Sequence, residues 1–289
     1  MSSDTATPGT PLAPFGARLR AAMDTRGPLC VGIDPHPGLL TAWGLADDVA
    51  GLERFARTTV EALAGQVAVL KPQSAFFERF GSRGVAVLET AVAEARSAGA
   101  LVLMDAKRGD IGSTMQAYAA TYLDKDSPLF SDAVTVSPYL GFGALRPALD
   151  AAAISGAGVF VLALTSNPEG AEVQRATAAD GRPVAQLILD HIAAENAGAT
   201  PLGSVGAVVG ATLGDVRVDL AVNGPLLAPG IGAQGATPAD LSGVFGPAIN
   251  DVLPSVSRGV LRYGPDIRAL RDGAERFTDE VKAAVDAAR

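Results

Sequence analysis

The sequence is poor in the residues that build disulfides and histidine-rich metal centres. It has one cysteine, Cys30, and two histidines, His36 and His191. One cysteine excludes an intramolecular disulfide and a cysteine-rich metal site, and two histidines argue against a multi-histidine metal centre. Cys30 lies inside an apolar run, which favours a small core residue over a nucleophile. We interpret the histidines as a surface residue and a structural helix residue, and expect no metal.

Positive charge and long apolar runs are also scarce. The formal net charge is −8, which argues against non-specific nucleic-acid binding, because that requires a basic face. No apolar stretch approaches the ~20 residues of a membrane span. Residues 1–10 lack the basic start and apolar run of a targeting segment. We therefore expect a cytoplasmic protein that binds neither membranes nor nucleic acid.

The sequence instead alternates short apolar runs with helical patterns. Runs suited to buried parallel strands fall at 29–34, 67–72, 101–105, 133–138, 158–165, 205–210, 226–231 and 255–261. Helical patterns separate them, including 48–65, 85–98, 114–123, 142–153, 184–196, 213–223 and 237–245, and a last one runs from 265 to the C-terminus. This alternation predicts one (β/α)8 barrel over residues 13–289, after a flexible tail at 1–12. A doubly wound open sheet is the alternative, but no glycine-rich dinucleotide turn follows the first strand.

A cluster of charges follows the third apolar run. Asp105 and Lys107 are two residues apart, so on a strand their side chains point to the same face. Gly109 permits a sharp turn that would bring Asp110 back toward the pair. Buried charges are costly unless they are paired. A structural ion cluster is one interpretation, and a catalytic cluster at a strand end is the other.

Further polar residues end the other predicted strands. The set is Asp34, Lys71, Asp105, Lys107, Ser166, Gln234 and Arg258. In a barrel, these ends meet at one mouth, where the chemistry is located. The glycine-rich turn 229–235 and Arg258 predict a phosphate site after strands seven and eight. The alternative for this turn is that its glycines serve packing alone.

Two motifs carry a resemblance to a known family. They are Asp-Ala-Lys-Arg-Gly-Asp-Ile at 105–111 and Leu-Lys-Pro-Gln-Ser-Ala-Phe-Phe-Glu at 70–78. Together they closely resemble orotidine 5′-phosphate decarboxylases, in particular the longer bacterial form, the type 2 subfamily. The resemblance runs from Gly32 to Gly259. The Asp-x-Lys-x-x-Asp core alone is shared with sugar-phosphate decarboxylases, whereas the segment 70–78 is more specific.

The resemblance implies a role for each matching residue. Lys107 matches the proton donor, and Lys71, Asp105 and Asp110 complete a charged tetrad. The substrate-binding residues implied are Asp34 and Lys71 for the ribose, Ser166 for the pyrimidine, and Gln234 and Arg258 for the phosphate. Residues matching Asp110, Ile111 and Thr114 reach into the neighbouring subunit's site, which implies a homodimer with shared active sites.

The resemblance also implies the reaction. Orotidine 5′-phosphate would lose CO2 and become uridine 5′-phosphate without a cofactor, as a step of de novo pyrimidine biosynthesis. Residues 166–182 are the predicted lid, because this polar stretch exceeds the usual strand–helix loop. The alternatives are a metal-dependent sugar-phosphate decarboxylase or aldolase of the same barrel group, and a nucleotide-binding barrel without catalysis.

Overall fold

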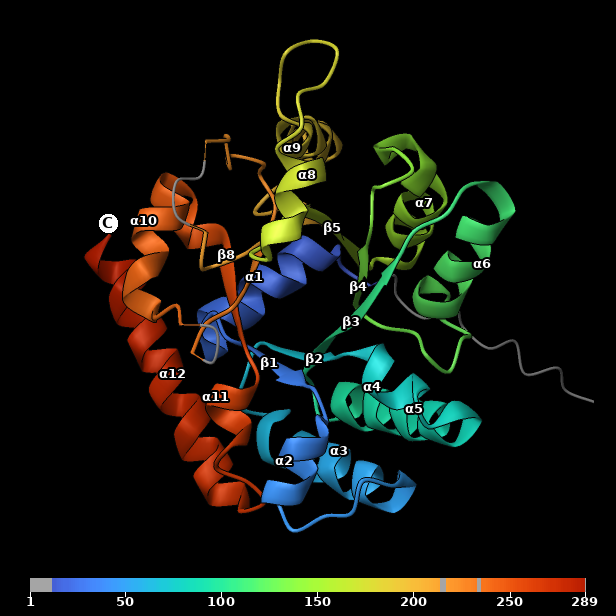
Figure 1. Cartoon of the computed structure of the whole chain (residues 1–289), viewed down its shortest axis with the longest axis vertical. Coiled ribbons are helices and arrows are strands. Elements are labelled where there is room, and N and C mark those ends of the chain that lie inside the picture. The colour runs from blue at the N-terminus through green and yellow to red at the C-terminus, as the bar shows by residue number, and fades with distance from the viewer. Residues whose placement is uncertain (1–11, 214–216, 233–234, 289) are drawn as a thin grey trace, which may run out of the picture.

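Eight parallel strands close into a barrel within the part of the chain that the structure describes (Figure 1). The structure is a computed structural model, and it describes residues 12–213, 217–232 and 235–288. The strands, in barrel order, are β1 (Cys30–Ile33), β2 (Val69–Pro72), β3 (Leu101–Arg108), β4 (Ala133–Val136), β5 (Gly158–Leu164), β6 (Val205–Val209), β7 (Leu226–Pro229) and β8 (Val252–Val256). Cys30 and Val31 of β1 pair with Ser255 and Val256 of β8, which closes the barrel. The predicted fold class is confirmed.

Helices surround this barrel (Figure 1). They are α1 (Phe15–Arg26), α2 (Pro37–Ala42), α3 (Val49–Leu63), α4 (Ser74–Glu78), α5 (Gly81–Ser97), α6 (Gly112–Leu123), α7 (Arg146–Ser155), α8 (Ala171–Gln174), α9 (Val184–Glu195), α10 (Leu241–Phe245), α11 (Arg258–Leu261) and α12 (Ile267–Ala287). Within the described ranges, 3-10 turns lie at Phe142–Leu145, Pro168–Gly170, Pro238–Asp240 and Gly246–Asp251. Among the described residues, none of the helices has the length and hydropathy that a transmembrane span requires.

The ends of the longer helices follow from local sequence. Asp48 caps α3, because its carboxylate accepts a hydrogen bond from the Gly51 N–H at 2.8 Å. Asp266 caps α12 in the same way. Gly156 ends α7 in a left-handed conformation, with φ +75°, which glycine adopts without steric cost. These capping residues place the helix boundaries close to those that the pattern predicts.

Helix α1 packs against the barrel interior. Its Phe15, Leu19 and Met23 join one buried cluster with strand residues such as Leu103 and Phe160. The Phe15 and Phe160 rings meet edge to face at 5.9 Å between centroids. Such burial of aromatic and aliphatic side chains contributes about 1.5–3 kcal/mol for each residue. The part of the barrel interior next to α1 is therefore filled with side chains.

Two predicted elements are wrong within the described residues. The eighth strand ends at Val256, before most of the predicted run 255–261, and Arg258–Leu261 forms the helical turn α11. The predicted helix 213–223 has no helix in its described part, and Leu220 and Val222 are buried there with the alternating spacing of extended chain. Of the predicted tail 1–12, only Leu12 is among the described residues.

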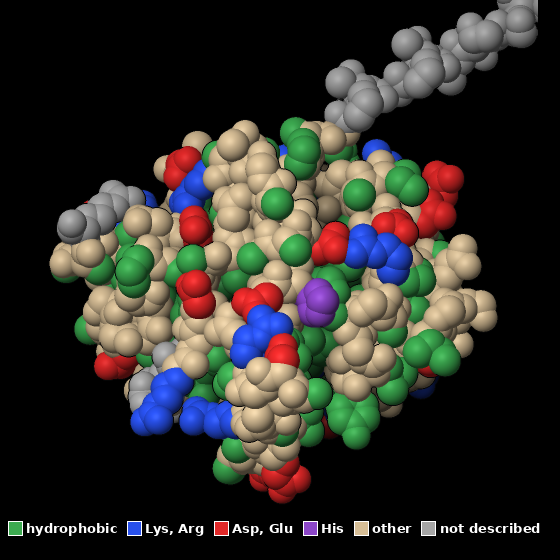
Figure 2. All heavy atoms as spheres, turned by 90° about the horizontal axis from the view of Figure 1, so that it is seen from above, with side chains coloured by type: hydrophobic (Ala, Val, Ile, Leu, Met, Phe, Trp, Pro, Cys, Tyr) green, Lys and Arg blue, Asp and Glu red, His purple; other side chains and the backbone are tan. Residues whose placement is uncertain are grey.

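Charges of both signs are interspersed over the surface. The face in Figure 2 carries acidic and basic side chains close to one another, separated by neutral atoms. Other charged side chains of the protein form ion pairs at the surface, such as Arg57 with Glu94 at 3.3 Å and Arg20 with Asp24 at 3.0 Å. Exposed pairs of this kind contribute little to stability, typically less than about 1 kcal/mol.

Candidate active site

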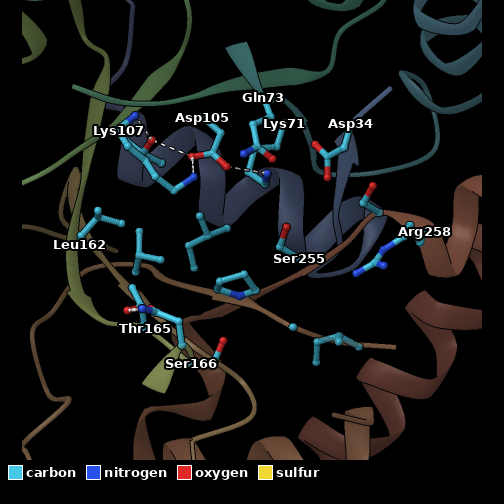
Figure 3. A pocket seen from close by; sticks show the side chains of 18 of the residues that line it. Asp34, Lys71, Gln73, Asp105, Lys107, Leu162, Thr165, Ser166, Ser255 and Arg258 are labelled. Atoms are coloured by element: carbon cyan, nitrogen blue, oxygen red, sulfur yellow. Dashed lines mark hydrogen bonds and ion pairs between the residues drawn. The ribbon is translucent and has the colours of Figure 1, made fainter. Parts of the chain in front are cut away.

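A cavity of about 420 Å³ opens at the C-terminal ends of the strands. Figure 3 shows Asp34, Lys71, Asp105 and Lys107 along one wall, with Thr165 and Ser166 across from them and Arg258 at a third side. The remaining lining residues are His36, Gln73, Phe76, Thr135, Leu162, Asn167, Val208, Leu227, Pro229, Gly230, Ile231, Ser255 and Ser257. The polar strand ends that the sequence predicts to converge, apart from Gln234, are thus brought together.

Asp105 lies between two lysines. Its Oδ2 is 3.0 Å from Lys71 Nζ, and its Oδ1 is 2.6 Å from Lys107 Nζ (dashed lines in Figure 3). Burial alone would raise the pKa of Asp105, but Lys71 and Lys107 outweigh burial and hold that pKa well below its usual range. Asp105 is therefore a carboxylate at neutral pH.

The two lysines have different environments. The side chain of Lys71 is 7% exposed and that of Lys107 is 45% exposed. Burial would lower the pKa of Lys71, but the carboxylates of Asp105 and Asp34 raise it above its ordinary value, so this lysine is locked in its charged form. Both lysines line the cavity, and Lys107, at the mouth of the barrel, is the more exposed of the two.

The backbone at Lys107 departs from regular strand geometry. Its φ is +47°, a left-handed value that non-glycine residues rarely adopt. The Lys107 N–H donates to Thr135 Oγ1 at 2.9 Å, and the Thr135 hydroxyl donates to Asp105 Oδ1 at 2.9 Å. Gly109 follows, and a Cβ there would lie 2.4 Å from the Ser137 carbonyl oxygen. Glycine is needed at 109 because the chain just after β3 lies close to the chain just after β4.

Asp34 contributes a second carboxylate to the cavity. It follows β1, and only 8% of it is exposed. Its Oδ1 is buried and accepts no hydrogen bond from the described residues. Buried acceptors are nearly always satisfied in folded proteins. Asp34 also lines the cavity, so its carboxylate is suited to accept a hydrogen bond from a bound hydroxyl group.

The predicted phosphate end of the cavity is partly described. Arg258 lines the cavity as the first residue of α11, not as a strand residue. Gly230 has a φ of +110°, so the turn after β7 uses a conformation that favours glycine. Ser257 and Ile231 line the same end. Gln234 lies outside the described residues.

Ser166 lies where β5 passes into the predicted lid, 166–182. This segment contains the 3-10 turn Pro168–Gly170 and the helix α8, so part of it has regular secondary structure. Gln174 of α8 holds it to the strand end, because its amide oxygen accepts from the Thr165 N–H at 2.8 Å and its amide group donates to Thr165 Oγ1 at 2.7 Å. Ser166 itself lines the cavity. The lid remains a prediction.

Three predicted site residues lie away from their own chain's cavity. Asp110, Ile111 and Thr114 do not line it, and the described residues show no ion pair between Asp110 and Lys107. The Asp110 carboxylate instead accepts from the adjacent Ile111 N–H at 2.8 Å. The expected return of Asp110 to the Asp105–Lys107 pair therefore does not occur within one chain. Ile111 is 61% exposed, and Thr114 is also exposed.

Several lining residues, above all Thr135, are not among the residues that the sequence predicts for the site. The available signal was one polar residue inside the apolar strand 133–136. His36, interpreted as a surface residue, is half-buried and packs edge to face on Phe76 with 4.2 Å between ring centroids. Burial lowers the pKa of His36, and the nearby charge of Arg258 adds to this, against the opposing effect of Asp34. His191 stacks on Phe142, away from the cavity.

The fold and the site together define a class of enzyme. A closed parallel barrel that carries a lysine–carboxylate array, a glycine-containing turn and an arginine at its C-terminal mouth is typical of barrel enzymes that act on phosphorylated substrates. An array of this kind supplies fixed positive charge and a proton, which suits reactions that develop negative charge on carbon.

Comparison with known proteins identifies the family. The sequence model of the orotidine 5′-phosphate decarboxylase / HUMPS family matches residues 27–272. An orotidine 5′-phosphate decarboxylase from Streptomyces coelicolor is 73% identical over 277 residues, which cover 96% of this chain and 100% of the relative. The chain therefore belongs to the orotidine 5′-phosphate decarboxylase / HUMPS family.

Solved structures agree with this membership. The crystal structure of a relative from Streptomyces avermitilis matches with a TM-score of 0.95 at 72% identity, and the match covers 98% of this chain and 100% of that one. A structure of an OMP decarboxylase from Leishmania donovani matches with a TM-score of 0.74 at 29% identity, covering 94% of this chain and 99% of that one. The resemblance that the two sequence motifs indicate is confirmed.

Proposed function

We propose that this protein converts orotidine 5′-phosphate into uridine 5′-phosphate and CO2 without a cofactor, with Lys107 as the proton donor. The observation that carries the proposal is the Lys71–Asp105–Lys107 array at the barrel mouth. In this family member, the array presents the partly exposed ammonium group of Lys107, which is ion-paired with the adjacent Asp105 carboxylate. The relatives at 73% and 67% identity are orotidine 5′-phosphate decarboxylases, which supports the same reaction here.

The substrate would be held at both ends of the cavity. Arg258 and the turn that begins at Gly230 would bind the phosphate through a charged fork and backbone N–H groups, together with Gln234. Asp34 and Lys71 would contact the ribose hydroxyls, and Ser166 the pyrimidine. This arrangement would bring the reacting carbon near Lys107. Binding energy from the remote phosphate would then help to close the lid at 166–182 over the site.

The proposed reaction needs no cofactor to accept electrons. The bond between C6 and the carboxylate breaks, CO2 leaves, and the electron pair stays on C6. Lys107 would stabilise this charge as it develops and then transfer one ammonium proton to C6, which gives uridine 5′-phosphate. The lysine regains its proton from solvent after product release. Leu162, Val208 and Leu227 line the same cavity, and their apolar surfaces strengthen the field of the ammonium group.

We also propose that the enzyme is a homodimer with shared active sites. In this proposal, Asp110, Ile111 and Thr114 complete the neighbouring subunit's site, and Asp110 becomes the fourth charge of the tetrad. Their position outside their own cavity and the exposure of Ile111 support this arrangement. Nearby Tyr139 and Leu140 are 76% and 53% exposed, and large exposed apolar residues that lie together favour an interface.

Subunit mixing tests the shared site. Lys107→Ala damages a chain's own site, whereas Asp110→Asn would damage its neighbour's. A hybrid dimer of the two variants has one site with both defects and one with neither, so an equal mixture that exchanges subunits should recover about a quarter of wild-type activity. No recovery after demonstrated exchange would contradict the shared site, as would a monomer in sedimentation velocity.

One assay tests the reaction itself. Loss of orotidine 5′-phosphate absorbance is followed with the purified full chain, with and without a chelator, and the product is identified by chromatography. The proposal expects equal turnover in both arms. Turnover of a sugar phosphate that depends on magnesium would favour the aldolase-type alternative. Tight binding of a 6-substituted uridine phosphate without CO2 release would favour a non-catalytic barrel.

The cellular setting is part of the same proposal. Orotidine 5′-phosphate is an intermediate of de novo pyrimidine biosynthesis, so we propose a cytoplasmic enzyme in which residues 13–289 form one catalytic domain. Fractionation of cells that express the natural chain, with activity measured in each fraction, tests the location. Activity that sediments with membranes would contradict it.

A further inference from the structure

Thr135 is a buried polar residue in an otherwise apolar strand. It lies in the middle of β4, is 1% exposed and lines the cavity. Its neighbours in the strand, Val134 and Val136, are buried apolar residues. A buried hydroxyl costs about 1–3 kcal/mol when its hydrogen bonds are missing. A threonine at this buried position is therefore explained by the groups that its hydroxyl binds.

The directions of the two Thr135 hydrogen bonds follow from which partner can donate and which can only accept. The Lys107 N–H can only donate, so Thr135 Oγ1 accepts it at 2.9 Å. The ionised Asp105 carboxylate can only accept, so the single hydroxyl proton of Thr135 points to Asp105 Oδ1 at 2.9 Å. The hydroxyl thus links the backbone of the proposed proton donor to the carboxylate that holds its ammonium group.

This link replaces missing main-chain pairing between β3 and β4. Met104 pairs with Val134 and Arg108 pairs with Val136, so the register shifts between these two points. Thr135 is the β4 residue opposite the irregular part of β3. Its side chain bonds the Lys107 amide that regular pairing would otherwise satisfy. The left-handed backbone of Lys107 is costly for a residue with a side chain, by about 1–2 kcal/mol, and this bond supports it.

We propose that Thr135 is a positioning residue for decarboxylation, which holds Asp105 and the Lys107 backbone so that the Lys107 ammonium group meets the reacting carbon. The inference rests on the proposed function. Lys107 has a long flexible side chain that is 45% exposed, and Asp105 is its ion-pair partner among the described residues. Asp105 also binds Lys71, so a rotation of its carboxylate changes both contacts. A misplacement of about 1 Å in such a site can cost roughly 100-fold in rate.

The test compares side chains that differ in the hydroxyl group. Thr135→Val keeps the shape but removes both hydrogen bonds, and we expect kcat to fall about 10- to 100-fold while KM changes less than about 3-fold. Thr135→Ser keeps the hydroxyl, and we expect kcat within about 3-fold of the wild type. Thr135→Ala differs from the serine variant only by the hydroxyl, so its kcat should fall below that of serine even if the valine variant does not fold.

A matched control separates positioning from general stability. Thr59 is fully buried in α3, and its hydroxyl donates to the Phe55 carbonyl oxygen at 2.8 Å, outside the cavity. Thr59→Val therefore removes a comparable buried hydrogen bond, and we expect its kcat to stay at the wild-type value. Melting temperatures of all variants are measured alongside. A kcat that follows the melting temperature across the series, regardless of the hydroxyl at 135, overturns the proposal.

The wild-type arm distinguishes the two possible failures. If the wild-type chain does not decarboxylate orotidine 5′-phosphate, the proposed function fails and this inference fails with it. If the wild type turns over but Thr135→Val or Thr135→Ala matches Thr135→Ser in kcat, only the positioning role fails. A rise in KM with unchanged kcat also contradicts positioning, because it would place Thr135 in ground-state binding.

Discussion

Replacing Lys107 with alanine is the most direct test of the mechanism. The substitution removes the ammonium group whose Nζ lies 2.6 Å from Asp105 Oδ1, and with it the proposed proton donor. Asp105 keeps its ion pair with Lys71 and its hydrogen bond from Thr135. The carboxylate therefore stays satisfied, and the variant is expected to fold.

The expected loss has two physical parts. A unit charge about 4 Å from the developing negative charge is worth about 4 kcal/mol at an effective dielectric constant of about 20. General acid catalysis contributes a further factor of about 10²–10⁴. Together they amount to about 7–9 kcal/mol, or a fall in kcat of roughly 10⁵- to 10⁷-fold. Because the side chain of Lys107 is 45% exposed, we expect the free energy of unfolding to change by less than about 1 kcal/mol.

Two measurements check this expectation. Single-turnover decay of orotidine 5′-phosphate absorbance, with enzyme in excess, gives the rate of the chemical step over many orders of magnitude. Calorimetric titration with uridine 5′-phosphate shows whether the nucleotide site is intact, and binding should stay detectable. Lys125→Ala is the matched control, because Lys125 is an exposed lysine outside the cavity, and its rate should equal that of the wild type.

A modest effect would refute the reasoning. If Lys107→Ala keeps kcat within about 100-fold of the wild type while it binds nucleotide normally, Lys107 is neither the proton donor nor the main source of electrostatic stabilisation. Loss of nucleotide binding together with unfolding would instead show that the lysine is structural.

Three further predictions concern neighbouring features. Asp105→Asn should lower the free energy of unfolding by about 3–5 kcal/mol in urea denaturation at pH 7, because it leaves Lys71 buried without its closest anion. The pKa of Asp105 in the folded state lies below the unfolded value of about 3.9, so the stability that its charge contributes is fully present above that pH and is lost as the pH falls through the folded pKa. The difference in unfolding free energy between wild type and variant should therefore shrink below about pH 4. A difference that stays constant with pH contradicts the ion pair. Gly109→Ala should cost about 1–3 kcal/mol of stability by calorimetry, because the new Cβ would lie 2.4 Å from the Ser137 carbonyl oxygen, and an unchanged melting temperature would show that the chain relaxes there. Arg258→Ala should lower kcat/KM at least 10-fold, or about 1.4 kcal/mol, in initial-rate assays, and a smaller effect would exclude it from phosphate binding.

The barrel could be predicted because its elements have strong local signals. Strands such as 158–164 are uninterrupted apolar runs, and glycines or prolines separate them from helical patterns. The eighth strand was misplaced because Pro254 interrupts its sequence, whereas the apolar run after Arg258 resembles a strand. Pairing of Leu226 with Val252 on the neighbouring strand decides where β8 lies. These two residues are far apart in the sequence, so a local sequence pattern cannot predict that they pair.

The site was predicted in part, for a related reason. Asp105 and Lys107 share a face because strand side chains alternate, and Lys71 joins them because the ends of parallel strands meet at one mouth. The sequence also predicts Asp110 beside them, but the path of the chain after β3 takes it away from the cavity. The role of Thr135 depends on the register shift between β3 and β4, which has no signature in either strand alone.

The alternation of strands and helices, the family, and the charged residues at the strand ends can all be read from the amino-acid sequence. These depend on side-chain period, turn residues and short motifs, all of which are local. The register at Thr135, the burial difference between Lys71 and Lys107, and the unsatisfied oxygen of Asp34 emerge only in the folded chain. Those features arise from packing between segments far apart in the chain, where hydrogen-bond and desolvation energies select one arrangement among many that the local patterns allow.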